Sequence, residues 1–183
     1  MSVSLTVRAG DATPEAIKRI RDAVVAAYMG GVAVFCSVSD ERPKTDEQVF
    51  PECLKGQVIP IGAATIQGHA HPAIDENAAS FLLPGVEIPS GEGELRTGSS
   101  IATALAAGLG GLLVYVARGL CPQHPLLLRP ARDALENAMK RLCRGPNDKY
   151  LAAWEVLLRL DMKTHEAALD CLQGLLSALG NKQ

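Results

Sequence analysis

The sequence predicts an α/β fold in which a parallel β-sheet is packed between helices. Two observations carry this prediction. First, short continuous apolar runs, which are typical of strands covered on both faces, occur at Val32–Cys36, Val58–Ala64 and Phe81–Gly85. Second, an amphipathic helical pattern precedes the first run, and a long apolar helical pattern follows the last. A strand, a helix and a further strand in this order imply a right-handed crossover.

The N-terminal region predicts a strand followed by a helix. Ser2–Val7 alternates apolar and polar residues and includes β-branched ones, which is typical of a short strand. Thr13 is a good N-cap, and Pro14 suits the first helical position. The helix should bury one face, made of Ile17, Ile20, Val24 and Ala27, and should end at Gly30-Gly31.

The segment between the first two apolar runs predicts a loop. Ser37–Lys55 is polar, contains two prolines, and has one short apolar turn at Val49–Phe50. Loops that follow parallel strands often carry functional residues. Pro60 would be awkward in a central strand, which weakens the strand prediction for Val58–Ala64.

The stretch Thr97–Gly119 organises the rest of the chain. It begins polar and glycine-rich and then becomes apolar on every side, so we expect a helix that starts at Ser100 and is buried all round. The free N–H groups and partial positive charge at a helix start favour an anion. Ser100 is therefore either a nucleophile or only an N-cap.

The C-terminal region predicts a helical tail. Three helical patterns, each with a leucine-containing stripe, follow Cys121: Ala131–Cys143, Asp148–Leu160 and Thr164–Leu179. We therefore divide the chain into an α/β unit at residues 1–120 and a helical tail at residues 121–183.

Composition narrows the possible functions. The 183 residues are 48% hydrophobic and 21% charged, which is enough for a sizeable core, and the net charge of −2 gives no basic surface for nucleic acid. We expect no membrane span and see no signal-peptide pattern, which predicts an intracellular protein. The five cysteines are scattered and form no metal-binding or redox pair, so we expect no cofactor.

Two further groups of residues suggest a metal site and a hydrolase nucleophile elbow. His69 and His71, with Asp75 and Glu76 nearby, could ligate a metal, although histidines in a polar loop are the simpler interpretation. The residues around Ser100 also approximate the Gly-x-Ser-x-Gly elbow of α/β-hydrolases, but an elbow needs a strand directly before the serine.

The start of the apolar stretch resembles the nucleophile signature of the subtilisin-like serine peptidases. Thr97–Gly108 reads TGSSIATALAAG, and the family signature reads GTSMATPHVAG. Ser100 takes the nucleophile position, whereas Ala104 and Leu105 replace the usual proline and histidine. The sequence is most similar to the GSSxATALAAG version found in intracellular subtilase-like domains of filamentous fungi.

The resemblance implies a three-layer subtilisin-like fold, of which this chain holds the C-terminal portion. Subtilases order their triad as Asp, His and Ser, and the segments resembled here all follow the family's Asp and His, which would lie before Met1. The family's oxyanion asparagine follows the strand equivalent to Val32–Cys36, where this sequence has Ser39 and Asp40.

The resemblance therefore implies the class of serine endopeptidase acting on peptides or proteins, with Ser100 as nucleophile and with no activity expected from the isolated chain. A non-catalytic remnant or interaction module is the alternative, in which a protein partner covers the surface left by the missing half. We predict that no histidine of this chain hydrogen-bonds Ser100.

Overall fold

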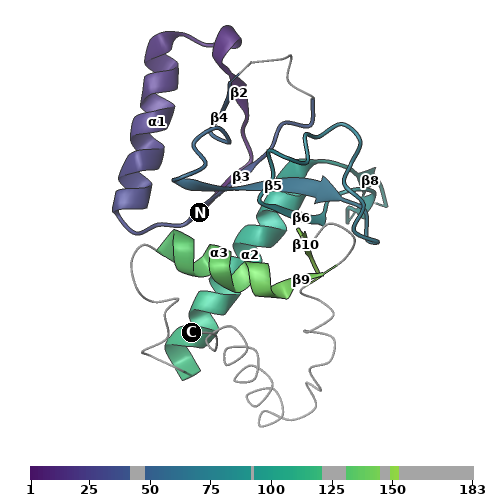
Figure 1. The fold of residues 1–183 in the computed structure, drawn as a ribbon. Coiled ribbons are helices and arrows are strands. Elements are labelled where there is room, and N and C mark those ends of the chain that lie inside the picture. Colours follow the sequence, from purple (N-terminus) through teal and green to yellow (C-terminus); the bar gives the residue numbers. More distant parts are fainter. Residues whose placement is uncertain (42–47, 92, 121–130, 145–148, 153–183) are drawn as a thin grey trace.

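The computed structural model describes residues 1–41, 48–91, 93–120, 131–144 and 149–152. Its centre is a six-stranded sheet in the order β1-β3-β5-β6-β10-β9 (Figure 1). Neighbouring strands are parallel, except that β9 runs antiparallel to β10. The strands are β1 (Ser2–Val3), β3 (Val34–Ser37), β5 (Val58–Ala64), β6 (Phe81–Pro84), β9 (Cys143–Arg144) and β10 (Tyr150–Leu151).

The first two apolar runs, which were predicted as strands of a parallel sheet, lie side by side in it. β3 and β5 are parallel neighbours, with Val34 opposite Val58 and Ser37 opposite Ile61. Every residue of both strands is buried, as expected for strands covered on both faces.

Pro60 lies inside β5 and does not interrupt it. Its carbonyl accepts a hydrogen bond from Ser80 N (2.9 Å), which lies on the side of β6. The N–H that proline lacks would have pointed to the same side, toward residues that precede β6, because this strand begins only at Phe81. The ladder therefore loses no bond at this position.

The sheet lies between two helical layers, which confirms the α/β prediction. On one face, Val24 of α1 (Pro14–Met29) packs with Val34, Cys36 and Val58. On the other face, α2 (Ser99–Leu120) and α3 (Ala131–Leu142) pack on Phe35 and Ile59. Side chains of consecutive strand residues point to opposite faces, so adjacent residues such as Val34 and Phe35 serve different layers.

Helix α1 begins as predicted. The Thr13 hydroxyl accepts a hydrogen bond from Ala16 N (3.2 Å), Pro14 is the first helical residue, and Gly30 caps the end. Gly31, which follows, has a φ of 76°, a conformation that glycine adopts without strain.

Helix α2 begins one residue earlier than predicted and is not buried all round. Ala102, Ala106 and Ala117 are fully buried against the sheet, but Tyr115 on the opposite side is 77% exposed and Leu105 is 48% exposed. The prediction that α2 is buried on every side was wrong, because an apolar sequence does not determine how many sides of a helix are covered by other elements.

α2 is also long and apolar enough to cross a membrane, by length and composition only, whereas we had expected no such segment. A soluble core helix passes the same test. Its inner face contacts β3, β5 and β6 (Figure 1), so this side of the helix is part of the core.

Two small antiparallel sheets flank the main one. β2 (Val7–Arg8) pairs with β4 (Val49–Phe50), and β7 (Ile88–Pro89) pairs with β8 (Leu95–Arg96). The predicted strand at Ser2–Val7 is therefore two short strands, with a 3-10 turn at Ala9–Asp11 after them. The apolar turn predicted at Val49–Phe50 is a strand.

The described residues after 120 are helical only in part. α3 agrees with the predicted helix at Ala131–Cys143, and its Leu135 and Met139 lie in the main core. Tyr150–Leu151, which we had placed in a helix, is strand β10 and pairs with β6. The helix predicted at Thr164–Leu179 lies outside the described residues, and the division at residue 120 stays a prediction.

Candidate functional site

The start of α2 is held close to the end of β6 by a tight backbone contact. Gly98 N donates to Gly85 O at 2.7 Å. A Cβ added at Gly85 would lie 2.8 Å from Gly98 O and 2.9 Å from Ala63 Cβ. Gly85 therefore allows an approach that no other residue would permit without a backbone shift.

Ser99 is the buried, structural serine of the pair at the helix start. It is 0% exposed, and its hydroxyl accepts a hydrogen bond from Ala63 N of β5 at 3.1 Å. The Thr103 hydroxyl, one turn later, donates to Ser99 O at 2.7 Å. These bonds fix the first turn of α2 against the sheet.

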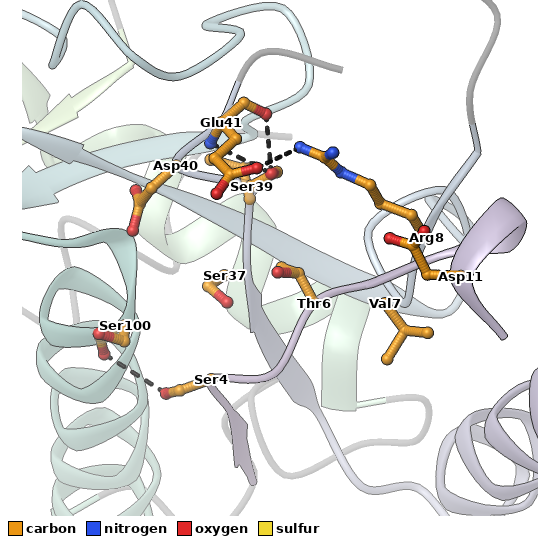
Figure 2. A pocket seen from close by; sticks show the side chains of 11 residues that line it. Ser4, Thr6, Val7, Arg8, Asp11, Ser37, Ser39, Asp40, Glu41 and Ser100 are labelled. Carbon is orange, nitrogen blue, oxygen red and sulfur yellow. Dashed lines mark hydrogen bonds and ion pairs between the residues drawn. The ribbon is translucent and has the colours of Figure 1, made fainter. Parts of the chain in front are cut away.

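Ser100 is the exposed serine, and it lines a cavity of about 470 Å³. Its carbonyl accepts a bond from the Ser4 hydroxyl at 3.4 Å (Figure 2). Its own hydroxyl has no hydrogen-bond partner among the described residues. The structure thus places Ser100 where a substrate could reach it and leaves it without an activating group from this part of the chain.

Asp40 occupies the positive end of α2. Both of its carboxylate oxygens accept from Ser99 N at 3.0 Å. A carboxylate at a helix N-terminus satisfies a free N–H group and interacts favourably with the helix dipole. Asp40 is therefore the side-chain cap of this helix, and its negative charge lines the same cavity as Ser100.

Ser39, the other residue predicted for the oxyanion region, is turned away from the helix start. Its hydroxyl donates to Glu41 O at 2.8 Å and accepts from Glu41 N at 3.2 Å. Of the two predicted residues, the structure brings only Asp40 to the first turn of α2.

Glu52 is a site-supporting residue that the sequence reasoning missed. Its buried carboxylate accepts from Ser39 N at 2.7 Å, and burial raises the pKa of this carboxyl above its usual range. The contact anchors the loop that carries Asp40. The signal in the sequence was a lone acid directly after the apolar pair Val49–Phe50 and a proline.

The rest of the cavity lining is mostly polar, with Val7 and Val38 as its apolar residues. Arg8 pairs with Glu41 at 2.5 Å, and Asp11 lies on the same side (Figure 2). Ser37 is 3% exposed, and its hydroxyl has no hydrogen-bond partner among the described residues although it lines the cavity.

The described histidines lie elsewhere. His71 lines a second cavity, also of about 470 Å³, which shares no residue with the first. The main chain of His69 turns back on Thr65 in the loop after β5. Neither imidazole adjoins Ser100, and His124 and His165 lie outside the described residues.

The other two constellations lack the geometry that they need. Within the described ranges, no three His, Cys, Asp or Glu side chains are grouped so that they could hold a metal ion. The strand before Ser100 is β8, whose one partner among the described strands is β7, and it is not in the central sheet. An α/β-hydrolase elbow would need a central strand there.

Comparison with known proteins gives a likeness in fold. No family model and no curated protein matches the sequence. Solved structures do match: MycP1 from Mycobacterium smegmatis at 17% identity, with a TM-score of 0.57 over 83% of this chain and 46% of that one. MycP3 protease from the type VII (ESX-3) secretion system matches at 17% identity, with a TM-score of 0.56 over 82% and 50% of the two chains.

These neighbours contradict the expectation of an intracellular protein. MycP3 is a protease of a type VII secretion system. A further match, at 15% identity and a TM-score of 0.53 over 90% of this chain and 46% of that one, is the periplasmic assembly from the ESX-5 inner membrane complex. The absence of a signal-peptide pattern was too weak an observation to carry that expectation.

The neighbours are subtilisin-like serine proteases, and the match covers about half of each of their chains. The parallel order of the sheet, the helices on both faces and the helix that starts beside Ser100 agree with that architecture. The chain therefore has a subtilisin-like α/β fold over about half the length of the proteins it resembles.

Proposed function

We propose that this chain carries the nucleophile part of a subtilisin-like serine endopeptidase site, with Ser100 in the nucleophile position and a peptide or protein as substrate. The observation that carries the proposal is the exposed Ser100 at the start of α2, beside a polar cavity. A helix start of this kind presents N–H groups and a positive dipole to a reacting carbonyl.

We further propose that the isolated chain does not hydrolyse peptides. A general base must lie within about 2.6–3.2 Å of the serine hydroxyl, or reach it through one water, and no imidazole of the described residues lines its cavity. In subtilisin, loss of the catalytic histidine alone costs a factor of about 10⁶ in kcat.

The Asp40 carboxylate supports the same conclusion for a second reason. Removing one oxyanion donor in subtilisin costs about 2.7–4 kcal/mol. Here the side chain at the helix start is the Asp40 carboxylate, an acceptor with a negative charge that is held on Ser99 N. It would repel an oxyanion as well as fail to donate to it.

A fluorophosphonate probe tests both proposals, because it labels serines that a neighbouring base activates. The purified chain, Ser100→Ala and Asp40→Asn are incubated with the probe, and adducts are located by mass spectrometry. We expect no rapid labelling of Ser100 in folded wild-type protein. Stoichiometric labelling that Ser100→Ala abolishes would refute inactivity and confirm the nucleophile.

A non-catalytic interaction module is the second candidate. It is favoured by Asp40, whose capping of α2 stabilises the helix start at the expense of oxyanion binding. Such a module would bind peptides without cleaving them. Isothermal titration with a peptide library, followed by mass analysis of the recovered peptides, distinguishes binding from turnover.

The likeness to secretion-system proteases supports a site of action at a secretion apparatus. Fractionation of the native host tests this proposal, since we expect the protein with the envelope or secreted fractions. Recovery only in the cytosol would refute it. The closer relation to fungal subtilase-like domains stays a prediction that rests on the Thr97–Gly108 signature.

A further inference from the structure

The cavity beside Ser100 has an excess of negative charge. Three carboxylates line it, from Asp11, Asp40 and Glu41, and the one cation among its described lining residues is Arg8. Three negative charges and one positive charge leave −2 on the lining at neutral pH. The Arg8 guanidinium is 2.5 Å from the Glu41 carboxylate, whose side chain is 78% exposed, so this pair lies at the rim. The excess charge therefore comes from Asp11 and Asp40.

Both of these carboxylates keep free acceptor positions. The Asp11 carboxylate has no hydrogen bond or ion pair within the described part of the chain. Asp40 shares one N–H, that of Ser99, between its two oxygens at 3.0 Å. Since a carboxylate offers about four lone-pair positions, each of the two side chains can accept further N–H donors.

A buried hydroxyl points into the same cavity without a partner. Ser37 ends β3, and its side chain lies on the α2 face of the sheet, because Phe35, two residues earlier, packs with α2. Ser37 is 3% exposed, and its hydroxyl has no hydrogen-bond partner among the described residues. Buried polar groups are normally hydrogen-bonded. A ligand that supplies the missing partner would account for this serine.

The size and chemistry of the cavity select the class of ligand. Its volume of about 470 Å³ is in the range of small-molecule sites. The described residues hold no group of three side chains suited to a metal ion, and Asp11 and Asp40 lie apart (Figure 2). No aromatic side chain is among the described lining residues, so the ring cage that favours quaternary ammonium groups is missing. An ammonium or guanidinium group fits, because its N–H donors match carboxylate and hydroxyl acceptors.

We infer that this cavity binds the side chain of a Lys or Arg residue of a peptide. The inference rests on the proposed function, which makes a peptide the ligand at Ser100. The cationic head group donates to the Ser37 hydroxyl and pairs with the Asp11 or Asp40 carboxylate, while the two valines of the lining contact the apolar stem. The same Asp40 charge that repels an oxyanion attracts such a side chain.

A nuclear magnetic resonance titration of the purified full chain tests this inference. Four peptides with blocked termini, Ala-Ala-X-Ala-Ala, carry Lys, Arg, norleucine or Glu at X, and norleucine keeps the apolar stem of Lys without its ammonium. We expect the Lys and Arg peptides to bind about tenfold or more tightly than the norleucine peptide, with the largest shifts at Thr6 and Ser37. Equal affinity for Lys and norleucine, largest shifts outside the cavity, or no binding at millimolar peptide would overturn the inference.

Two further ligands identify the source of the positive charge. n-Butylammonium presents the head group and stem without a peptide, and Ca²⁺ presents charge without N–H donors. We expect n-butylammonium to compete with the Lys peptide but to bind more weakly, and Ca²⁺ to leave the Thr6 and Ser37 signals unchanged. If n-butylammonium bound as tightly as the Lys peptide, the ligand would be a free amine, and if Ca²⁺ gave the same shifts, it would be a metal ion. Either result would refute the inference.

Three variants test the named residues and provide a control. Asp11→Asn removes an exposed carboxylate, and Ser37→Ala removes a hydroxyl that has no described partner to lose, so both should keep the thermal midpoint within a few degrees of wild type. Both should weaken binding of the Lys peptide about three- to tenfold. Asp22→Asn removes the same charge from the exposed side of α1, outside the cavity, and should change the affinity less than about twofold. Losses no larger than that of Asp22→Asn would refute the roles of Asp11 and Ser37.

Fluorophosphonate labelling separates this inference from the proposed function. If Ser100 is labelled in the folded chain but the four peptides bind alike, the nucleophile proposal stands and the cation site fails. If the Lys and Arg peptides bind selectively but their backbones show no nuclear Overhauser contact with Ser100, the cation site stands and the peptidase proposal fails.

Discussion

Replacing Asp40 should separate two contributions to the stability of α2. The carboxylate satisfies Ser99 N with both oxygens at 3.0 Å. Loss of a side-chain cap typically costs about 0.5–2 kcal/mol, and a charge at a helix N-terminus contributes a further 0.3–1 kcal/mol or so. Asp40→Ala removes both contributions, so we expect a loss of about 0.8–3 kcal/mol. Asp40→Asn keeps an acceptor and should lose only about 0.3–1 kcal/mol.

Urea unfolding followed by circular dichroism at neutral pH measures both variants. Thermal melts provide a second measurement, since each kcal/mol corresponds to about 2–4 °C in Tm for a chain of this size. Added salt should shrink the difference between wild type and Asp40→Asn, because salt screens the charge–dipole interaction. Asp11→Asn is the control: its carboxylate is exposed and lines the same cavity, and we expect a change within about 0.5 kcal/mol.

The reasoning would be refuted if Asp40→Asn and Asp40→Ala were equally unstable, or if neither differed from wild type. The first result would mean that the amide cannot take over the cap, and the second that the carboxylate does not support the helix at all.

Three further predictions concern the frame of the site. Gly85→Ala should destabilise the protein by about 1–3 kcal/mol, because its Cβ would lie 2.8 Å from Gly98 O and the backbone must shift; an unchanged urea midpoint would contradict this contact. Gly110→Ala should cost a similar amount through its clash with a buried ring, whereas Gly108→Ala meets open space and should gain up to about 1 kcal/mol of helix propensity; changes of the same sign would rule out the inner and outer assignment. Glu52→Gln should flatten the pH dependence of stability, because burial raises the folded-state pKa of Glu52. In wild type, this raised pKa stabilises the folded state fully below the unfolded-state pKa of about 4.3. The stabilisation is lost as the pH rises through the folded-state pKa. Thermal melts from about pH 4 to 8 check the slope, which should be smaller in the variant, and parallel slopes would exclude Glu52 as its source.

The parts of the fold that local sequence determines could be predicted. The continuous apolar runs gave β3, β5 and β6, and the Thr13 cap with its proline gave the start of α1. These features depend on burial and on bonds within a few residues. β10 was placed in a helix because its two residues form a strand by pairing with β6 and β9, and the local sequence pattern does not contain these contacts.

The resemblance predicted which residues lie together at the candidate site, while their roles stay predictions. Ser100 and Asp40 were expected near each other from the resemblance, and the structure brings them to the same turn. The buried Glu52 behind Ser39 was missed because 13 residues separate them. The exposed side of α2 was missed because apolar composition indicates that a helix tends to be buried but does not indicate which of its sides other elements cover.

The two serines at the start of α2 also show how a helix can be held at one rotational setting. The pairing of β5 with β3 ends at Ile61, which lies opposite Ser37. Ala63 lies two residues beyond this point, and its N–H donates to the Ser99 hydroxyl and not to a neighbouring strand. Successive helical residues are about 100° apart, so a turn of α2 by one residue would break this bond and carry Ser100 into the core. An unpaired buried N–H costs about 1–3 kcal/mol. A single backbone N–H of the sheet thus selects which of two neighbouring hydroxyls faces the cavity.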